Sequence, residues 1–288
     1  MPYFDFHIHS KYSRCCKRKG IYGYRDIWER IQECNLDGFG VSDHSHNKIY
    51  TKPEKFIPEY KKVQKDLGLQ KKGLVGMEVS IYNLKGELGI HPRVIKLLDY
   101  FLFAEHVHKG KPFTGLYKKK YKIRYWLKQF PKKEDKILKE FDKVIDMQIR
   151  ALYVNKDIIE GPKILAHIYK FVAGMGYLPQ KIFERLDEVL EALQNTNTAL
   201  EIHKSHWDYY QSDTEAQERI IAGENTRKDF IHYLYKRAKR YSLTYALGSD
   251  AHRLSEIKTR EQWKEFLQDL NISENSLLTP NLKKRLQC

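Results

Sequence analysis

Short apolar stretches alternate with longer amphipathic stretches along almost the whole chain. The apolar stretches predict strands at residues 3–8, 38–42, 74–77, 100–104, 163–166, 198–203 and 243–248. Between them, apolar residues recur with the spacing of a helix that buries one face, which predicts helices at residues 25–34, 55–67, 135–153, 180–194, 228–241 and 262–270. Strands that alternate with helices indicate parallel βαβ units. About seven such units predict an α/β protein close to a full (β/α) barrel.

Polar residues that can bind metal ions stand at the ends of these predicted strands. They are His7, His9, His44, Glu78, His106, His167, Asp250 and His252. Catalytic residues of a parallel barrel lie at the carboxyl ends of its strands, so we expect these side chains to converge. Imidazoles and carboxylates together suit zinc, manganese or iron. Several converging ligands predict a site with more than one metal ion, which is the usual arrangement for cleaving phosphate esters.

Two motifs carry more of this prediction than the others. His7 and His9 are two apart on a strand, so both rings point to the same face and can reach one ion. Asp250 and His252 repeat the spacing after the last strand and can serve neighbouring ions. Glu78 is either a surface carboxylate or a bridge between two cations. Each remaining histidine, taken alone, is equally compatible with a satisfied polar residue.

The net positive charge of the chain favours a negatively charged binding partner. The 288 residues include 52 Lys and Arg against 37 Asp and Glu, a net charge of +15, which attracts phosphates. The excess is largest at residues 109–139, where aromatic residues lie among the basic ones. This pattern suits single-stranded nucleic acid, but it also describes an amphipathic helix packed on the barrel. Residues 109–155 have too few apolar residues for a core of their own, so we predict a basic helical insertion within one domain of residues 1–288.

The remaining composition excludes other classes of protein. No apolar run reaches the roughly 20 residues that span a bilayer, and the first residues lack the pattern of a signal peptide. We therefore expect a cytoplasmic protein without a membrane partner. The four cysteines, Cys15, Cys16, Cys34 and Cys288, do not form a disulfide framework. The first two either lie at the metal site or are loop residues.

Taken in order, the polar motifs resemble the PHP (polymerase and histidinol phosphatase) domain family of metal-dependent phosphoesterases. The matching segments are 5–10 for D-x-H-x-H-[ST], 42–44 for T-D-H with Ser in place of Thr, 76–78 for the glutamate after a glycine-containing strand, 99–106 for D-Y-x5-H, 166–167 for A-H and 248–252 for G-S-D-A-H. Each motif alone is unspecific, but together they cover nearly the whole chain.

The resemblance implies a distorted (β/α)7 TIM-like barrel with two or three divalent ions (Zn, Mn or Fe). Carried over residue by residue, the first ion would be held by His7, His9, Glu78 and Asp250, which would then be the catalytic residues. The second ion would be held by Glu78, His106 and His167. The third would be held by His44 and His252.

The chain departs from the family pattern at one ligand. The family usually supplies a His or Asp five or six residues beyond the second His of the opening motif, where this chain has Arg14 and Cys15. A guanidinium has no free lone pair, so we expect Arg14 to clamp a substrate phosphate instead. The third ion should then be weak or absent unless Cys15 turns inward. Arg253 and His203 are further candidates for binding substrate.

The predicted function is hydrolysis of phosphate esters by a metal-activated water. The substrate is either a small phosphomonoester or a nucleic acid, and the basic stretch favours nucleic acid slightly. An alternative is a non-catalytic, nucleic-acid-binding module of PHP-like type. The near-complete ligand set argues against that alternative.

Overall fold

The computed structural model describes residues 1–13, 15–16, 22–45, 53–104, 134–158, 160–168, 184–203 and 227–280. The strands are β1 (Phe4–Ile8), β2 (Gly38–Val41), β3 (His44–Ser45), β4 (Gly73–Ser80), β5 (Tyr100–Ala104), β6 (Lys163–Leu165), β7 (Ala199–His203) and β8 (Tyr245–Gly248). The α-helices are α1 (Tyr24–Glu33), α2 (Pro53–Asp66), α3 (Pro92–Ile95), α6 (Glu134–Val154), α8 (Leu186–Asn195), α11 (Arg227–Ala238) and α12 (Arg260–Asp269). Apart from β3 and α3, each corresponds to an element predicted from the sequence.

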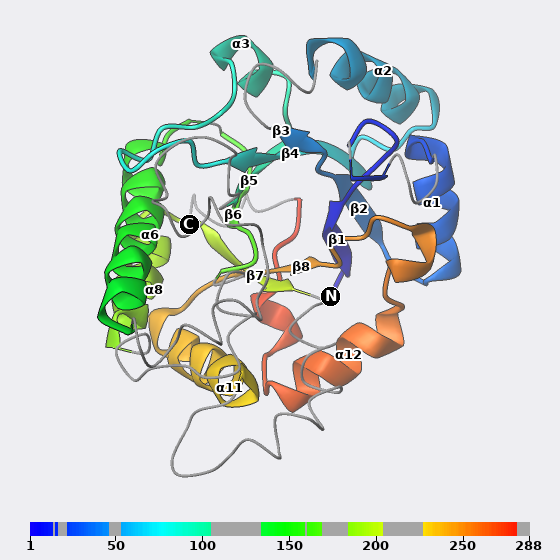
Figure 1. Ribbon diagram of the computed structural model, residues 1–288. Coiled ribbons are helices and arrows are strands. Elements are labelled where there is room, and N and C mark those ends of the chain that lie inside the picture. Colours follow the sequence, from blue (N-terminus) through cyan, green and yellow to red (C-terminus); the bar gives the residue numbers. More distant parts are fainter. Residues whose placement is uncertain are drawn as a thin grey trace.

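The strands form a closed parallel barrel (Figure 1). Their order is β2-β1-β8-β7-β6-β5-β4, and β4 pairs back with β2, with Phe39 opposite Gly73. Seven strands therefore close the barrel, and the helices surround it. The short strand β3 adds to the carboxyl half of β4, where His44 lies opposite Glu78. The prediction of an α/β, (β/α)7 TIM-like barrel is confirmed.

Two layers of buried apolar side chains stabilise the barrel. Alternate residues of six strands, among them Phe6, Tyr100 and Ala246, meet in one cluster that fills the interior. The residues between them pack outward against the helices in a second, larger cluster. The helices α8 and α12 bury one face each, and α12 begins at a capping box on Thr259.

Strand β1 departs from strict alternation, and the departure positions the site. Phe4 and Phe6 belong to the interior cluster, so regular pleating would turn His7 and His9 outward. The pairing of β1 with β2 shifts register between Asp5 and Ile8. Within this irregularity the main-chain N–H of His7 donates to the Asp5 carboxylate at 3.1 Å. The inward face therefore changes after Phe6, and both imidazoles reach the barrel mouth.

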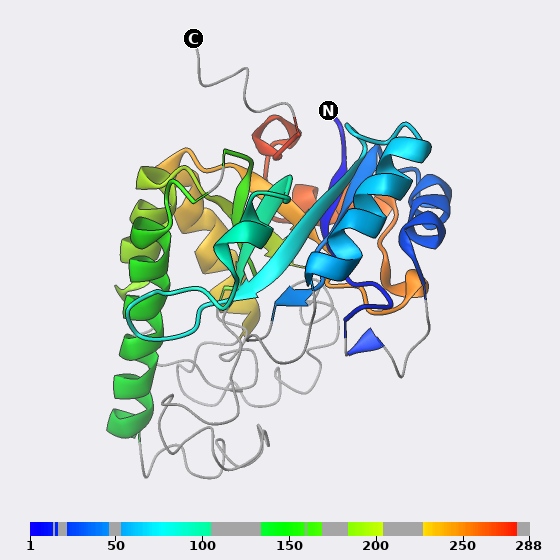
Figure 2. The same ribbon diagram turned by 90° about the horizontal axis from the view of Figure 1, so that it is seen from above.

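The last described segment packs against the amino-terminal end of the barrel. Leu277 bridges to Tyr245, and Leu278 joins the interior cluster. In Figure 2 this segment lies at the same end of the barrel as the N-terminus. The opposite, carboxyl end of the barrel is the end at which the predicted ligands stand.

Helix α6 links β5 to β6 and packs beside α8 (Figure 1). Its residues Ile145 and Leu152 belong to the outer core, so it is one of the helices that cover the barrel. Residues 105–133, which hold most of the predicted basic insertion, lie outside the described residues.

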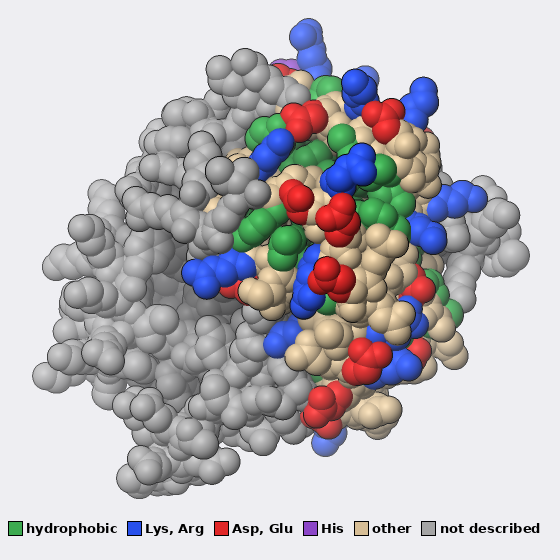
Figure 3. All heavy atoms as spheres, turned by 90° about the vertical axis from the view of Figure 1, so that its right-hand side faces the viewer, with side chains coloured by type: hydrophobic (Ala, Val, Ile, Leu, Met, Phe, Trp, Pro, Cys, Tyr) green, Lys and Arg blue, Asp and Glu red, His purple; other side chains and the backbone are tan. Residues whose placement is uncertain are grey.

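Described surface charges are mixed in sign on the face shown in Figure 3. Lys and Arg side chains lie among Asp and Glu there. Among the described ion pairs, Arg260 of α12 pairs with Asp37. In the described ranges, no helix has both the length and the apolar character that a bilayer crossing requires.

Candidate metal centre

Side chains from the carboxyl ends of the strands converge in one buried cluster, called here the strand-end cluster. It consists of His7, His9, His44, Glu78, His167, Asp250 and His252. Seven of the eight predicted metal ligands are thus brought together. The eighth, His106, lies outside the described residues.

Glu78 on β4 lies at the centre of the strand-end cluster and is fully buried. Its Oε1 is 2.6 Å from Nε2 of His167, and its Oε2 is 2.6 Å from Nδ1 of His44. The same Oε2 is 3.5 Å from Nε2 of both His7 and His9. Because its two oxygens face different imidazoles, the carboxylate has the geometry of a bridge between two cations.

Asp250 approaches the cluster from the end of β8. Its Oδ1 is 2.9 Å from Nε2 of His9 and 3.5 Å from Nε2 of His7. Asp250 and His167 both have left-handed backbone, with φ of 49° and 30°. Such conformations cost of the order of 1–3 kcal/mol and cluster at functional sites. At His167 the main-chain N–H is held by a hydrogen bond to Glu201.

Hydrogen bonds of Nδ1 fix which ring nitrogen of His7, His9 and His252 faces the cluster. Nδ1 of His7 donates to Glu201 at 2.6 Å, and Nδ1 of His252 donates to the Asp250 carbonyl at 2.7 Å. Nδ1 of His9 lies 3.2 Å from Ser13 Oγ, whose own proton is donated to Asp43. Each Nε2 therefore keeps its lone pair for another partner.

The donor set fits divalent cations. Within the described ranges, the buried Nε2 of His7 has no hydrogen-bond partner, although it points between two carboxylates. Mutually close donors, all within 4.8 Å of one another, include His7, His9 and Glu78 in one group and His9, Asp250 and His252 in another. A buried imidazole that faces carboxylates with its lone pair requires either a proton or a metal ion between them.

Burial and opposite charges shift several pKa values in the site. Burial alone would lower the pKa of His7, but Glu201, and then Glu78, raise it well above its ordinary value. Burial also opposes protonation of His44, yet Glu78 and the contact with Cys15 raise its pKa to about 10. For Glu201, burial raises the pKa, but His7 and His203 lower it to about 2. The negative field of the carboxylates thus favours positive charge in the cluster.

Glu201 on β7 supports two ligands at once. Its carboxylate accepts from Nδ1 of His7 and from the main-chain N–H of His167. Gly248 makes this possible, because a Cβ at that position would collide with the Glu201 carboxylate. The available sequence signal was an acid two residues before a histidine at the end of a predicted strand.

Asp43, although next to His44 in the predicted motif, does not face the strand-end cluster. Its carboxylate accepts hydrogen bonds from Ser10 and Ser13, at 2.8 Å from the Ser10 N–H and 2.6 Å from each hydroxyl, and from Tyr60 at 3.3 Å. Asp43 therefore holds the loop that follows β1.

The structure describes two of the three predicted substrate-binding residues. His203 is buried at the end of β7, with Nε2 3.4 Å from Oδ2 of Asp250. Arg253 is exposed, and its main-chain N–H donates to Glu256. Arg14 lies outside the described residues. Cys15 does turn inward, since its sulfur lies within 4.8 Å of the ring nitrogens of His9 and His44.

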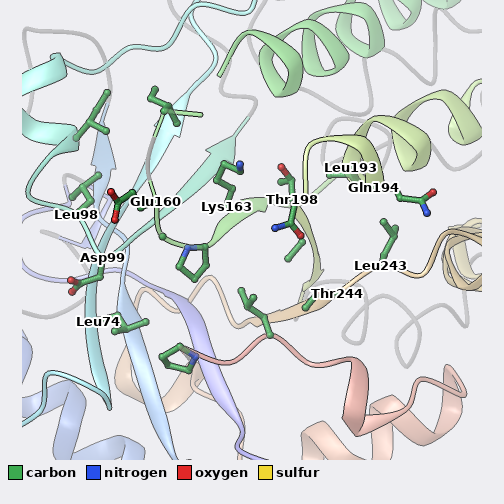
Figure 4. Close-up of a pocket in the computed structure, with 18 of the residues that line it drawn as sticks. Leu74, Leu98, Asp99, Glu160, Lys163, Leu193, Gln194, Thr198, Leu243 and Thr244 are labelled. Carbon is green, nitrogen blue, oxygen red and sulfur yellow. The ribbon is translucent and has the colours of Figure 1, made fainter. Parts of the chain in front are cut away.

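A cavity of about 660 Å³ lies at the other end of the barrel (Figure 4). Its lining includes Leu74, Asp99, Lys163, Thr198 and Thr244, which stand at or just before the amino ends of β4 to β8. Barrel enzymes carry their catalytic groups at the carboxyl ends. The strand-end cluster lies at that end of the barrel, and this cavity does not.

Comparisons with known proteins show what this chain is similar to. The family model for the PHP domain matches residues 5–205. The structure of a histidinol phosphate phosphatase from Lactococcus lactis subsp. lactis Il1403, complexed with zinc, L-histidinol and phosphate, is similar, with a TM-score of 0.57, 15% identity and 94% of each chain covered. The hisK protein of Listeria monocytogenes, assigned as a histidinol phosphatase, has a TM-score of 0.56 at 11% identity, with 90% of this chain and 99% of that chain covered. A search of curated proteins finds no match.

Proposed function

The chain belongs to the PHP domain family, and on this premise we propose that it is a metal-dependent phosphoesterase. The observation that carries the proposal is the position of Glu78, whose two carboxylate oxygens each face different imidazoles in a buried cluster. Bound divalent ions would supply the Lewis acidity that activates water and neutralises the phosphate.

We assign the ligands from the family pattern together with the observed geometry. The first ion would be held by His7, His9, Glu78 and Asp250. The second would be held by Glu78 and His167, with His106 as the third ligand. His44 and His252 would hold a further ion. Zinc, manganese and iron all suit nitrogen and oxygen donors of this kind.

The protein's own residues orient the ligands and control protons. Glu201 keeps the Nδ1 proton on His7 and so presents Nε2 to the cluster. The chain from Asp43 through Ser13 does the same for His9. His203 lies beside Asp250 at the edge of the cluster, where we propose that it contacts the substrate and donates a proton to the leaving oxygen.

We propose a small phosphomonoester as the first candidate substrate. The similar Lactococcus lactis structure holds L-histidinol and phosphate, which are the two parts of such an ester. The test is hydrolysis of a chromogenic phosphomonoester, a chromogenic phosphodiester and a single-stranded oligonucleotide by the metal-reconstituted protein. Faster hydrolysis of the monoester is expected. Loss of that activity in a Glu78→Gln variant that remains folded ties it to the cluster, whereas retained activity would contradict the proposal.

Nucleic acid is the second candidate substrate, and the basic composition favours it. Residues 109–133 combine lysines with aromatic residues, and the chain carries a net charge of +15. Such segments bind phosphate backbones and stack bases. The same segment suits a non-catalytic nucleic-acid-binding module, but seven gathered ligand residues favour an enzyme. Preferred cleavage of the oligonucleotide in the same assay would identify a nuclease.

A further inference from the structure

The loop after β1 delivers Cys15 to the strand-end cluster. Two turns bend this loop, with Ser13 N–H donating to Ser10 O and Cys16 N–H donating to Ser13 O, both at 3.0 Å. The side chains of Ser10 and Ser13 are tied to the buried Asp43. These hydrogen bonds set the position of Cys15.

Cys15 is surrounded by imidazoles that belong to the proposed metal site. Its sulfur and the ring nitrogens of His9 and His44 all lie within 4.8 Å of one another, and it also contacts the His252 side chain. The rings of His9 and His252 are 4.4 Å apart, and those of His9 and His44 are 4.3 Å apart. The half-buried sulfur and the imidazoles of His44 and His252 offer the sulfur and nitrogen donors that zinc binds in proteins.

The tautomer of His252 supports the same geometry. Its Nδ1 donates to the Asp250 carbonyl, which leaves the lone pair on Nε2. On His44, Nδ1 faces Glu78, and the side chain also contacts the Cys15 sulfur. The side chains of His44 and His252 therefore both reach the sulfur, beside which an ion would be held.

We propose that Cys15 binds, through its thiolate, the ion that His44 and His252 would also hold, and that this sulfur selects zinc over manganese there. The inference rests on the proposed function, because it requires ions in the strand-end cluster. Thiolate favours the softer zinc, whereas manganese prefers oxygen donors, so a sulfur ligand at this position determines which ion is held.

Cobalt substitution tests this directly, because cobalt bonded to thiolate gives a sulfur-to-metal charge-transfer band in the near ultraviolet. The experiment compares the full-length chain with Cys15→Ser and Cys34→Ala after chelation and reconstitution with cobalt. Cys34 is a matched control, since its sulfur is buried in the core and faces the Ile257 carbonyl at 3.7 Å. We expect the band in the unmodified chain and in Cys34→Ala, and its loss in Cys15→Ser.

The outcomes separate this inference from the proposed function. A chain that binds cobalt without the band, or a Cys15→Ser variant that keeps it at full intensity, would overturn the thiolate ligand but leave the phosphoesterase proposal intact. A chain that takes up no cobalt would overturn both.

Cys15→His keeps a metal-binding side chain at this position, so it is the control in case Cys15→Ser fails to fold. It should retain the ion count, lose the charge-transfer band and lose the preference for zinc over manganese in a competition titration. In the zinc-loaded unmodified chain, X-ray absorption should show a sulfur neighbour at about 2.3 Å, and this neighbour should be absent in Cys15→His. An unchanged zinc preference in Cys15→His would contradict the selectivity.

Discussion

Nδ1 of His7 lies 2.6 Å from Oε1 of Glu201, although β8 separates their strands in the barrel. The carboxylate reaches His7 across β8 at Gly248, which has no Cβ to obstruct it. One buried acid on β7 therefore sets the tautomer of a proposed ligand on β1. This hydrogen bond leads to two predictions.

Glu201→Gln should weaken metal binding without removing a ligand. The amide retains the shape of the side chain but loses the charge that favours the Nδ1 proton of His7. Outer hydrogen-bond partners of metal ligands are typically worth about 10–100-fold in affinity, and we expect a zinc affinity reduced by that factor. Competition with a chelator measures it. Equal zinc affinity in the two folded proteins would show that Glu201 does not position His7.

Gly248→Ala should disturb the same hydrogen bond by displacing the Glu201 carboxylate. The new methyl group collides with the Glu201 carboxylate, so we expect the free energy of unfolding to fall by about 1–3 kcal/mol. A double-mutant cycle with Glu201→Ala, measured by urea denaturation, supplies the control. The cost of Gly248→Ala should shrink in the Glu201→Ala background. An equal loss of unfolding free energy in both backgrounds would show that the new methyl group does not collide with Glu201.

Asp43 and His44 should behave differently despite being adjacent. Asp43→Asn leaves some of its three hydroxyl partners unsatisfied in a buried site, so the metal-free protein should lose about 1–3 kcal/mol of stability. The comparison variant is Glu59→Gln, which alters an exposed ion pair with Lys11 and should cost less than about 1 kcal/mol. Urea denaturation distinguishes them, and equal losses would contradict a structural role for Asp43.

Much of the fold could be predicted from the sequence because its signals are local. Apolar runs and helical spacing mark seven strands and the main helices, and all seven strands occur in the structure. Strand β3 and helix α3 were not predicted, because elements of two and four residues carry no periodic pattern. The position of His7, His9 and Glu78 at one end of the barrel follows from their places at strand ends in a closed parallel sheet.

The supporting hydrogen bonds could not be predicted, because they depend on distant parts of the chain. His7 and Glu201 are 194 residues apart, and they meet only once β8 presents Gly248 between them. The inward turn of His7 and His9 depends on a register shift that strict alternation does not show. The approach of Cys15 depends on the Asp43 hydrogen bonds that bend the loop.

The basic segment gives a prediction that concerns nucleic acid. Replacing several lysines between Lys118 and Lys133 by alanine should weaken oligonucleotide binding and flatten its salt dependence, by about one unit of slope for each lysine that pairs with a phosphate. Hydrolysis of a small chromogenic phosphoester should persist. Binding isotherms at several salt concentrations measure the effect. If both activities fall together, the segment is structural and the nucleic acid hypothesis fails.

The central claim is that Glu78 joins a multinuclear metal site, and metal content tests it most directly. The measurement is elemental analysis of the full-length chain after chelation, reconstitution with zinc or manganese and removal of loose ions, beside Glu78→Gln. We predict two or three ions per chain, and a loss of at least one in Glu78→Gln, because the bridging charge is removed. Fewer than one ion per chain after reconstitution, or equal ion content in the two folded proteins, would contradict the account.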